Sequence, residues 1–276
     1  MLSPGSSIAG YVVERVVGSG GIGVLYKARQ LRLDRPVALK VVEAQAAEDG
    51  LVRERLRREA RTVAALDHPN VVPLYEAGEE AGAVFIATRW VDGTDLGTLI
   101  RRDHPLRPRR ASRLAAQIAS ALEVAHEQEL IHRDVKPSNV IVTAEDHVYL
   151  TDFGLTKRAQ SLSGFTAGGQ MLGTIDYVAP EQIEGGETGP RGDVYGLACV
   201  LYEMLGGYAP FARASGGTAK LWAHLNTPPP SVRELRPDVP EALDDVIRRG
   251  MAKRPDERPS AATFGAAVLR AVGEAP

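Results

Sequence analysis

His132-Arg133-Asp134-Val135-Lys136-Pro137-Ser138-Asn139, with Asp152-Phe153-Gly154 downstream, is the stretch on which the interpretation of this sequence depends. It supplies a carboxylate that can act as a base, a lysine that can face a phosphate, and an amide and a second carboxylate that can bind a metal ion. Transfer of a phosphoryl group from ATP requires the protein mainly to position the reactants and to neutralise charge on the phosphate oxygens. The stretch therefore predicts a phosphoryl-transfer site.

The composition is that of a folded globular protein. The chain has 276 residues, of which 44% are hydrophobic, enough for one large core or two lobes. Its net charge of -2 gives no basic field, so we expect no nucleic-acid partner. The single cysteine, Cys199, lies in an apolar run and has no partner for an internal disulfide, so we expect a buried thiol.

The sequence contains no sign of a membrane segment. No apolar stretch reaches the roughly 20 residues that a membrane-spanning helix needs. Residues 1–10 lack the charged and apolar regions of a signal peptide. We expect a cytoplasmic setting, with a longer native protein that carries a tail or a membrane anchor as the open alternative.

The first third of the chain is rich in β-branched runs separated by Gly-containing or Pro-containing turns. Strands are expected at residues 11–17, 24–28, 37–42, 71–77 and 83–91. Residues 48–65, between the third and fourth of these strands, show helical spacing of their apolar side chains. The pattern predicts a small β-rich lobe that contains one helix.

After a connector at residues 92–96 the apolar period becomes helical. One long helix is expected to end near His126, and further helices are expected at residues 193–205, 218–225, 240–252 and 260–272. The expected fold is therefore of the α+β class, with a small N-terminal lobe, residues 1–91, and a larger, mainly helical C-terminal lobe, residues 92–276. A ligand is expected between the two lobes.

A glycine-rich hexapeptide, Gly18-Ser19-Gly20-Gly21-Ile22-Gly23, follows the first predicted strand. A dinucleotide-binding fingerprint would require a helix directly after it, and a Walker loop would require Gly-Lys followed by Ser or Thr. Here residues 24–28 continue as a strand. The hexapeptide could be a plain hairpin turn, or it could fold over a triphosphate, because glycines let backbone N–H groups approach the oxygens.

Lys40 lies near the end of the predicted strand at residues 37–42, and a lysine that points into a cleft needs a counter-charge. Glu59, on the predicted helix that follows, is the preferred partner. Glu54 on the same helix is the alternative.

Five motifs in order make the chain resemble a eukaryotic-like protein kinase domain over about residues 8–272. They are the glycine-rich hexapeptide, Val37-Ala38-Leu39-Lys40, residues 132–139, residues 152–154 and Ala179-Pro180-Glu181. The residues around the last motif resemble the bacterial serine/threonine-protein kinase branch. The resemblance implies a bilobal protein-kinase-like fold and transfer of the γ-phosphoryl group of ATP to Ser or Thr hydroxyls of protein substrates.

The resemblance also implies roles for single residues. Asp134 would accept or orient the proton of the substrate hydroxyl, and Lys136 would steady the transferred phosphoryl group, with Lys40 and Glu59 completing the catalytic set. Asn139 and Asp152 would hold Mg²⁺, for which Mn²⁺ is an alternative. The residues expected to bind the nucleotide are Gly18, Ser19, Gly20, Gly21, Ile22, Gly23, Leu25, Ala38, Lys40, Thr88, Arg89, Val91, Asp95 and Ile141.

The resemblance extends to support and regulation. Asp193 would anchor the backbone of the catalytic loop, and Glu181 with Arg258 would form a buried pair. The hydroxyls of Thr166, then Ser163, with Ser161 also present, are the expected sites of an activating autophosphorylation, because a phosphate can order such a segment.

Other functions stay open at this point. A pseudokinase scaffold would bind nucleotide without catalysis, but Lys40, Asp134 and Asp152 are all present. A small-molecule phosphotransferase of related fold is a further alternative. Resemblance to bacterial kinases also implies a homodimer formed through the small lobe.

Overall fold

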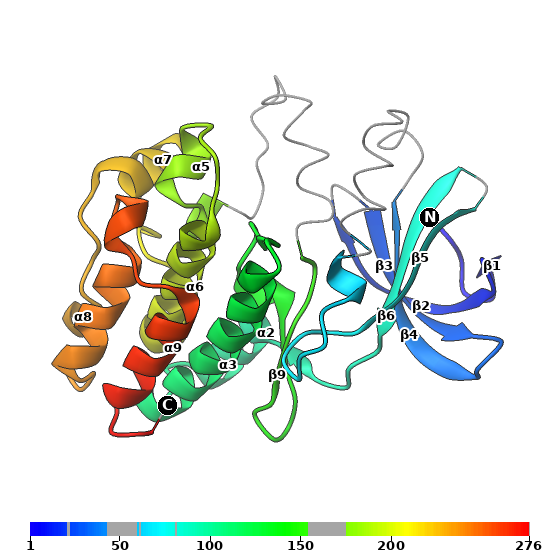
Figure 1. Cartoon of the computed structure of the whole chain (residues 1–276), viewed down its shortest axis with the longest axis horizontal. Helices are drawn as coiled ribbons and strands as arrows, with labels where there is room; N and C mark the ends of the chain where they lie inside the picture. The colour runs from blue at the N-terminus through cyan, green and yellow to red at the C-terminus, as the bar shows by residue number, and fades with distance from the viewer. Residues whose placement is uncertain (21–22, 43–59, 61, 81, 154–174, 276) are drawn as a thin grey trace. The chain divides into compact units, whose positions relative to one another are not determined.

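The computed structural model describes residues 1–20, 23–42, 60, 62–80, 82–153 and 175–275. Its backbone forms two compact units, which are drawn as ribbons in Figure 1. Unit 1 contains the described residues within 1–67 and 71–92. Unit 2 contains residues 68–70, 93–153 and 175–275, so the short segment 68–70 packs with unit 2 although both its chain neighbours belong to unit 1.

Unit 1 is an antiparallel sheet with the strand order β1-β2-β3-β4-β6-β5. Its strands are β1 Ser7–Ile8, β2 Tyr11–Gly20, β3 Gly23–Gln30, β4 Arg35–Val42, β5 Leu74–Glu80 and β6 Ala83–Arg89. Side chains alternate in burial along β3 and β4, as expected for strands with one face against a core. Tyr26, Leu39 and Ala87, at most 1% exposed, belong to this core face.

Unit 2 is mainly helical and contains one small sheet, of order β7-β8-β9. The strands are β7 Thr94–Asp95, β8 Val140–Val142 and β9 Val148–Leu150. The helices are α2 Leu96–Asp103, α3 Pro108–Glu127, α5 Pro180–Ile183, α6 Pro190–Gly206, α7 Gly217–Asn226, α8 Glu241–Gly250 and α9 Ala261–Arg270. Short 3-10 turns are η2 Pro137–Asn139, η3 Ile175–Tyr177, η4 Val232–Glu234 and η5 Pro255–Glu257.

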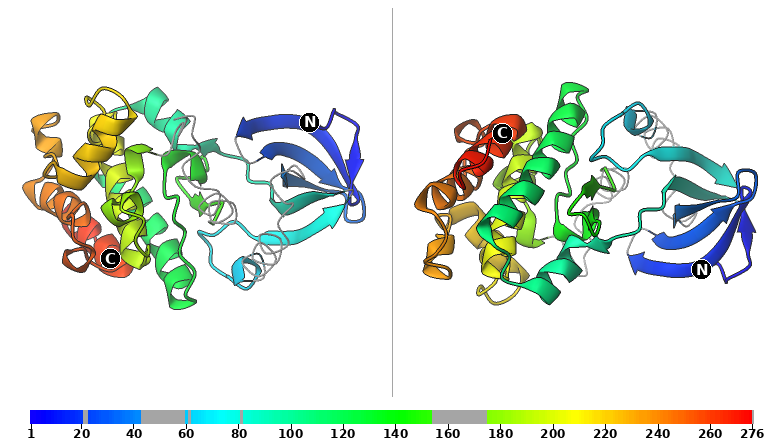
Figure 2. Two further views of the ribbon diagram at one scale, coloured as in Figure 1. Left: turned by 90° about the horizontal axis from the view of Figure 1, so that it is seen from above. Right: turned by 90° about the horizontal axis from the view of Figure 1, so that it is seen from below.

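Helix α6 is the centre of unit 2. It is apolar on all sides, and its residues from Gly192 to Tyr202 are all buried, which is typical of a helix inside a larger core. It contacts α3, α8 and α9 (Figure 2). A helix packed in this way gives a rigid base for the polar side chain that it carries near its N-terminus, Asp193.

The structure confirms the predicted α+β class and most of the predicted elements. The fourth predicted strand is wrong at its start, since β5 begins at Leu74 and not at residue 71. Val71 and Val72 are apolar and buried, but they precede the strand. Pro73, which follows them, has no N–H to donate to a sheet. The strand predicted to end at Val91 ends at Arg89.

Most of the helix predicted at residues 48–65 lies outside the described residues, although residues 60 and 62–64 are helical. The sequence analysis did not identify the short strands β1 and β7 or the β8–β9 hairpin. Among the described helices, none combines the length and the apolar composition that crossing a membrane would require.

Candidate functional site

The predicted catalytic loop, residues 132–139, lies between α3 and β8 and is fixed by one buried carboxylate. Asp193 of α6 is 1% exposed. It accepts hydrogen bonds from the backbone N–H groups of His132, at 2.8 Å, and Arg133, at 2.7 Å. Nε2 of His126, at the end of α3, lies 2.8 Å from the same carboxylate. The predicted anchoring role of Asp193 is confirmed, and His126 is a partner that the sequence analysis missed.

The loop also packs closely on α6 at a glycine. A Cβ atom on Gly196 would lie 3.0 Å from the carbonyl oxygen of Val135 and 3.1 Å from its Cβ atom. Such distances are shorter than ordinary carbon contacts, so a larger residue would push the loop off the helix. Arg133 has a φ of 63°, a left-handed conformation that is uncommon for a residue with a side chain. The backbone is therefore constrained at both neighbours of Asp134, namely at Arg133 and at Val135.

Three of the predicted site residues meet within this loop. Lys136 Nζ lies 2.8 Å from Asp134 Oδ2. Asn139 ends the η2 turn and is 6% exposed. Its Nδ2 donates to the Asp134 carbonyl, at 2.8 Å, and to Asp134 Oδ2, at 3.2 Å. The result is a half-buried carboxylate with a cation on one side and a fixed amide on the other.

Asp152, the second predicted metal-binding residue, follows strand β9 and is joined to the loop through its neighbours. Thr151 donates its backbone N–H to the Asn139 carbonyl at 2.9 Å. Nε2 of His132 lies 2.8 Å from the Thr151 carbonyl. Asp152 itself has a φ of 57°, and such a conformation persists only where the surroundings impose it. The two carboxyl-bearing segments are therefore parts of one connected backbone network.

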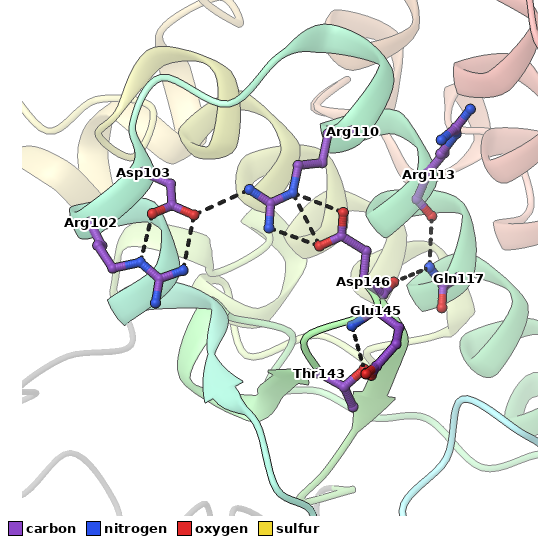
Figure 3. A network of polar contacts seen from close by, with 8 residues as sticks. All are labelled: Arg102, Asp103, Arg110, Arg113, Gln117, Thr143, Glu145 and Asp146. Carbon is purple, nitrogen blue, oxygen red and sulfur yellow. Dashed lines mark hydrogen bonds and ion pairs between the residues drawn. The ribbon is translucent and has the colours of Figure 1, made fainter.

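The turn of the β8–β9 hairpin is held by an ion-pair network that reaches it from helices α2 and α3 (Figure 3). Arg110 of α3 binds both oxygens of Asp146 in the turn, at 2.8 to 3.1 Å. Arg110 also contacts Asp103, at the end of α2, at 3.2 Å, and Asp103 pairs with Arg102. Hydrogen bonds from Arg102, which has the larger effect, and from Arg110 lower the pKa of Asp103 to about 2. No motif in the sequence identified these residues.

In unit 1, the predicted glycine-rich loop is a hairpin between β2 and β3. Gly18 pairs with Leu25, Ser19 with Val24, and Gly20 with Gly23, so the expected strand-turn-strand arrangement is confirmed for the described residues. A Cβ atom on Gly23 would lie 2.3 Å from the Val41 carbonyl oxygen. Only glycine can occupy that position without moving β3 away from β4.

Four of the predicted nucleotide-binding residues share one face of this sheet. Leu25 lies opposite Lys40, and Ala38 lies opposite Thr88. Residues directly opposite each other, and residues two apart on one strand, point to the same face. This is the face opposite to the core, and all four side chains are partly exposed there.

The other predicted nucleotide-binding residues are divided between the two units. Arg89 ends β6, and its backbone N–H donates to the Pro73 carbonyl at 2.9 Å. Val91 follows in unit 1. In unit 2, Asp95 Oδ1 caps helix α2 by accepting the Thr98 N–H at 2.9 Å. Ile141 of β8 is the register partner of Asp95.

Several predicted residues lie outside the part of the chain that the structure describes. They are Gly21, Ile22, Glu59 with its alternative Glu54, and the hydroxyl-bearing residues Ser161, Ser163 and Thr166.

The predicted pair of Glu181 and Arg258 is confirmed. Arg258 Nη1 and Nη2 bind the two carboxylate oxygens of Glu181 at 2.8 and 2.9 Å. The remaining N–H groups of this guanidinium donate to backbone carbonyls, those of Ala252, Arg191 and Lys253. All five donors of the arginine are therefore used, and its side chain is fully buried.

The η3 turn, which carries Asp176 and Tyr177, is attached to helices α6 and α7. Tyr177 donates its hydroxyl to Glu203 of α6 at 2.6 Å, and Asp176 pairs with Lys220 of α7. Burial raises the pKa of Glu203. Cys199 on α6 is fully buried, and burial raises the pKa of its thiol, so the expectation of a buried thiol is confirmed.

Comparison with known proteins gives consistent results. The family model described as "Protein kinase domain" matches residues 11–267. Serine/threonine-protein kinase PknD of Mycobacterium tuberculosis is 45% identical over 92% of this chain and 38% of its own length. Serine/threonine-protein kinase PknH of Mycobacterium bovis is 42% identical over 92% of this chain and 42% of its own length. The chain thus spans about two fifths of the curated relatives it matches.

Among solved structures, the Mycobacterium tuberculosis PknI kinase domain superposes with a TM-score of 0.79 at 30% sequence identity. The match covers 99% of this chain and 100% of that one. The fold described above is therefore shared with that domain along nearly the whole chain.

The contacts of Arg258 lead to a stability prediction. Arg258→Met leaves the Glu181 carboxylate, whose side chain is only 12% exposed, without its partner, and it also removes the donors to three backbone carbonyls, so we expect the free energy of unfolding to fall by about 3–5 kcal/mol. The double variant E181Q/R258M should be less destabilised than the sum of the single variants, with a coupling of about 2 kcal/mol. Denaturant titration of the four chains measures both quantities.

Arg254 provides the matched control, because it is exposed and its ion pair with Asp256 is solvent-screened. Arg254→Met should leave the unfolding midpoint unchanged. Additive effects of the Glu181 and Arg258 variants would contradict the role assigned to this pair.

Proposed function

The chain belongs to the protein kinase family, and on that premise we propose that the protein transfers the γ-phosphoryl group of ATP to Ser or Thr hydroxyls of proteins. The observation that carries the proposal is the grouping of Lys136 and Asn139 around the Asp134 carboxylate, on a loop fixed by Asp193. A base, a cation and a metal-binding amide are the groups that this reaction needs close together. We propose residues 1–91 and 92–276 as the two lobes of one kinase domain.

Asp134 is the proposed base. Its carboxylate accepts the proton of the acceptor hydroxyl as the oxygen attacks the γ-phosphorus, and ADP leaves with the electron pair of the broken bond. Lys136 Nζ lies 2.8 Å from the same carboxylate. The positive charge of the lysine is therefore next to the base, where it stabilises the negatively charged phosphoryl group during transfer. Because both groups are on a fixed loop, little reorganisation is needed during the reaction.

Kinase domains use ATP with a divalent metal ion, and the residues of unit 2 fit such an ion. The Asn139 amide makes both of its hydrogen bonds to Asp134 through Nδ2. Its Oδ1 is therefore not used in these bonds and is the atom that would bind a metal ion. Asp152 adds an exposed carboxylate. Hard oxygen ligands of this kind suit Mg²⁺. We propose that Asn139 and Asp152 hold Mg²⁺, with Mn²⁺ as a substitute. The bound ion would neutralise charge on the phosphate oxygens.

The proposed nucleotide-binding residues of unit 1 are supported by their shared position. Strand β3 links the two parts: it forms the hairpin with β2 at Gly20 and Gly23, and it carries Leu25, which lies opposite Lys40 on the face shared with Ala38 and Thr88. A face with partly exposed small and apolar side chains suits a flat base such as adenine. Glu59 remains the proposed partner of Lys40. Arg89, Val91, Asp95 and Ile141 are proposed to complete the site.

We expect Asp134→Asn to lower phosphate incorporation from ATP into a generic protein substrate about 100- to 10,000-fold, as for removal of a general base. The same variant should gain no phosphate between residues 152 and 181, whereas the parent chain should be modified there on incubation with ATP and Mg²⁺, first at Thr166. A radiolabel assay and mass spectrometry of the intact segment measure the two effects. Ser138→Ala changes an exposed neighbour in the same loop and serves as the control.

Three other results would contradict the proposal. A parent chain that binds ATP but transfers nothing would be a pseudokinase. One that phosphorylates small alcohols and no protein would be a small-molecule phosphotransferase. Near-parental transfer by Asp134→Asn would remove the assigned base.

We also propose that two copies pair through the small lobe. The turn between β3 and β4 exposes two large apolar side chains, Leu31 at 60% and Leu33 at 59%. Two exposed leucines close together on a short turn form an apolar patch that a partner surface could cover. Leu33→Asp should shift the chain towards the monomer in sedimentation velocity experiments, while Trp222→Asp, at a residue that is 61% exposed on α7 of unit 2, should not. Equal sedimentation of parent and Leu33→Asp chains at all concentrations would refute the pairing.

A further inference from the structure

Strand β9 is the edge strand of the small sheet in unit 2, and it leads directly to Asp152. At its end, the Thr151 N–H donates to the Asn139 carbonyl on the β8 side. In an antiparallel pair, residues bonded to the partner strand alternate with residues whose backbone groups face away from it. The backbone groups of Leu150 and Val148 therefore face the open edge.

Two side-chain amides, and one backbone carbonyl, occupy that open edge. The Val148 N–H donates to Oε1 of Gln117 at 2.9 Å, and the Val148 carbonyl accepts from Nδ2 of Asn70 at 2.9 Å. The Leu150 N–H donates to the Asn70 carbonyl at 2.7 Å. Val148 and Leu150 are both 0% exposed, so without these partners the buried polar groups would be unsatisfied. Asn70 and Gln117 therefore make the hydrogen bonds that a neighbouring strand would otherwise make with β9.

The carboxamide of Gln117 has no freedom to turn. Its Oε1 also accepts from Asn70 Nδ2 at 3.0 Å. Its Nε2 donates to the carbonyls of Asp146, at 2.9 Å, and Arg113, at 3.5 Å. Figure 3 shows Gln117 reaching from α3 to the hairpin turn, where Arg110 holds the Asp146 side chain. A half turn of the amide would place Nε2 against the two donors, Val148 N–H and Asn70 Nδ2, and Oε1 against the carbonyl oxygens of Asp146 and Arg113.

The open edge of β9 leads along the chain to Asp152. The residue lies two positions beyond Leu150 and has a φ of 57°. For a residue with a side chain this conformation is strained and relaxes when its flanking chain is released. The β8 side of the strand is fixed to the catalytic loop at Asn139, and on the open side the backbone groups of Val148 and Leu150 are held by the groups named above.

We propose that Gln117 and Asn70 are positioning residues of the phosphoryl-transfer site, which hold β9 so that the Asp152 carboxylate stands in its metal-binding position. The inference rests on the proposed function, because it takes Asp152 as a metal ligand. Neither residue touches the reacting atoms. Loss of either amide should weaken metal binding more than it weakens nucleotide binding.

The test compares Gln117→Leu with Ser120→Ala. Ser120 lies one turn further along α3 and binds His68 in the same 68–70 segment at 3.0 Å, but it does not reach β9. Mn²⁺ is titrated into each chain in the presence of ADP, and the free-ion electron paramagnetic resonance signal reports binding without any catalysis. We expect Gln117→Leu to weaken Mn²⁺ binding about 10-fold, the size typical of residues that orient metal ligands. Ser120→Ala should match the parent chain.

Gln117→Glu is the conservative variant, and it keeps the test informative if the leucine variant folds poorly. It retains an acceptor for the Val148 N–H but replaces the donor to the hairpin turn by a carboxylate oxygen that faces the Asp146 carbonyl, so it should recover part of the affinity and not all of it. ADP affinity measured without metal should be the same in all chains. Amide exchange at Val148 and Leu150 should be faster in Gln117→Leu.

The outcomes separate this inference from the proposed function. If the parent chain binds Mn²⁺ with ADP and transfers phosphate, and both Gln117 variants bind the ion as tightly as it does, the positioning role is refuted while the kinase assignment stands. If the parent chain neither binds the ion nor transfers phosphate, the proposed function fails and this inference fails with it.

Discussion

A single buried carboxylate, that of Asp193, sets the course of the backbone on which the candidate site depends. It sits near the start of a helix that is packed on every side, and it accepts the N–H groups of two successive residues, His132 and Arg133. A buried charge of this kind is tolerated only when its hydrogen bonds are made. The requirement works in both directions, because the loop satisfies the carboxylate and the carboxylate fixes the loop. Asp134, Lys136 and Asn139 are placed as a consequence.

The second carboxyl group, Asp152, is placed by a different means. Its strand is joined to the loop at Thr151 and Asn139 and is held along its outer edge by Gln117 and Asn70. The ion pairs of Asp146 and Asp103 fix the hairpin turn behind it. Polar side chains from α2 and α3 thus act on the site without facing it. The arrangement stores local strain at Arg133 and Asp152, both in left-handed conformations, next to the residues with proposed chemical roles.

The sequence predicted the chemistry of the site better than its support. Asp134, Lys136, Asn139 and Asp152 could be found because they stand in short motifs, and the structure brings the first three into contact. Gln117 could not, since a polar residue on an amphipathic helix has the same pattern whether it faces water or a strand edge. The predicted start of β5 is wrong for a related reason, because Val71 and Val72 are buried apolar residues that precede the strand, whether or not a residue of this kind continues into it. The long-range pairs of Asp193 and of Glu181 with Arg258 were predicted only through family resemblance, because no local spacing encodes a contact between distant residues.

The most direct test of the account is amide hydrogen exchange at His132 and Arg133 in the variant Asp193→Asn, measured together with phosphate transfer. The amide side chain keeps the volume of the carboxylate but presents N–H₂ where one of the two backbone N–H groups needs an acceptor. The account predicts that exchange at these two amides becomes about 10-fold faster or more, as expected when local opening costs over 1 kcal/mol less, and that transfer falls in parallel. Unchanged exchange at both amides, with transfer either lost or retained, would show that this carboxylate does not hold the catalytic loop.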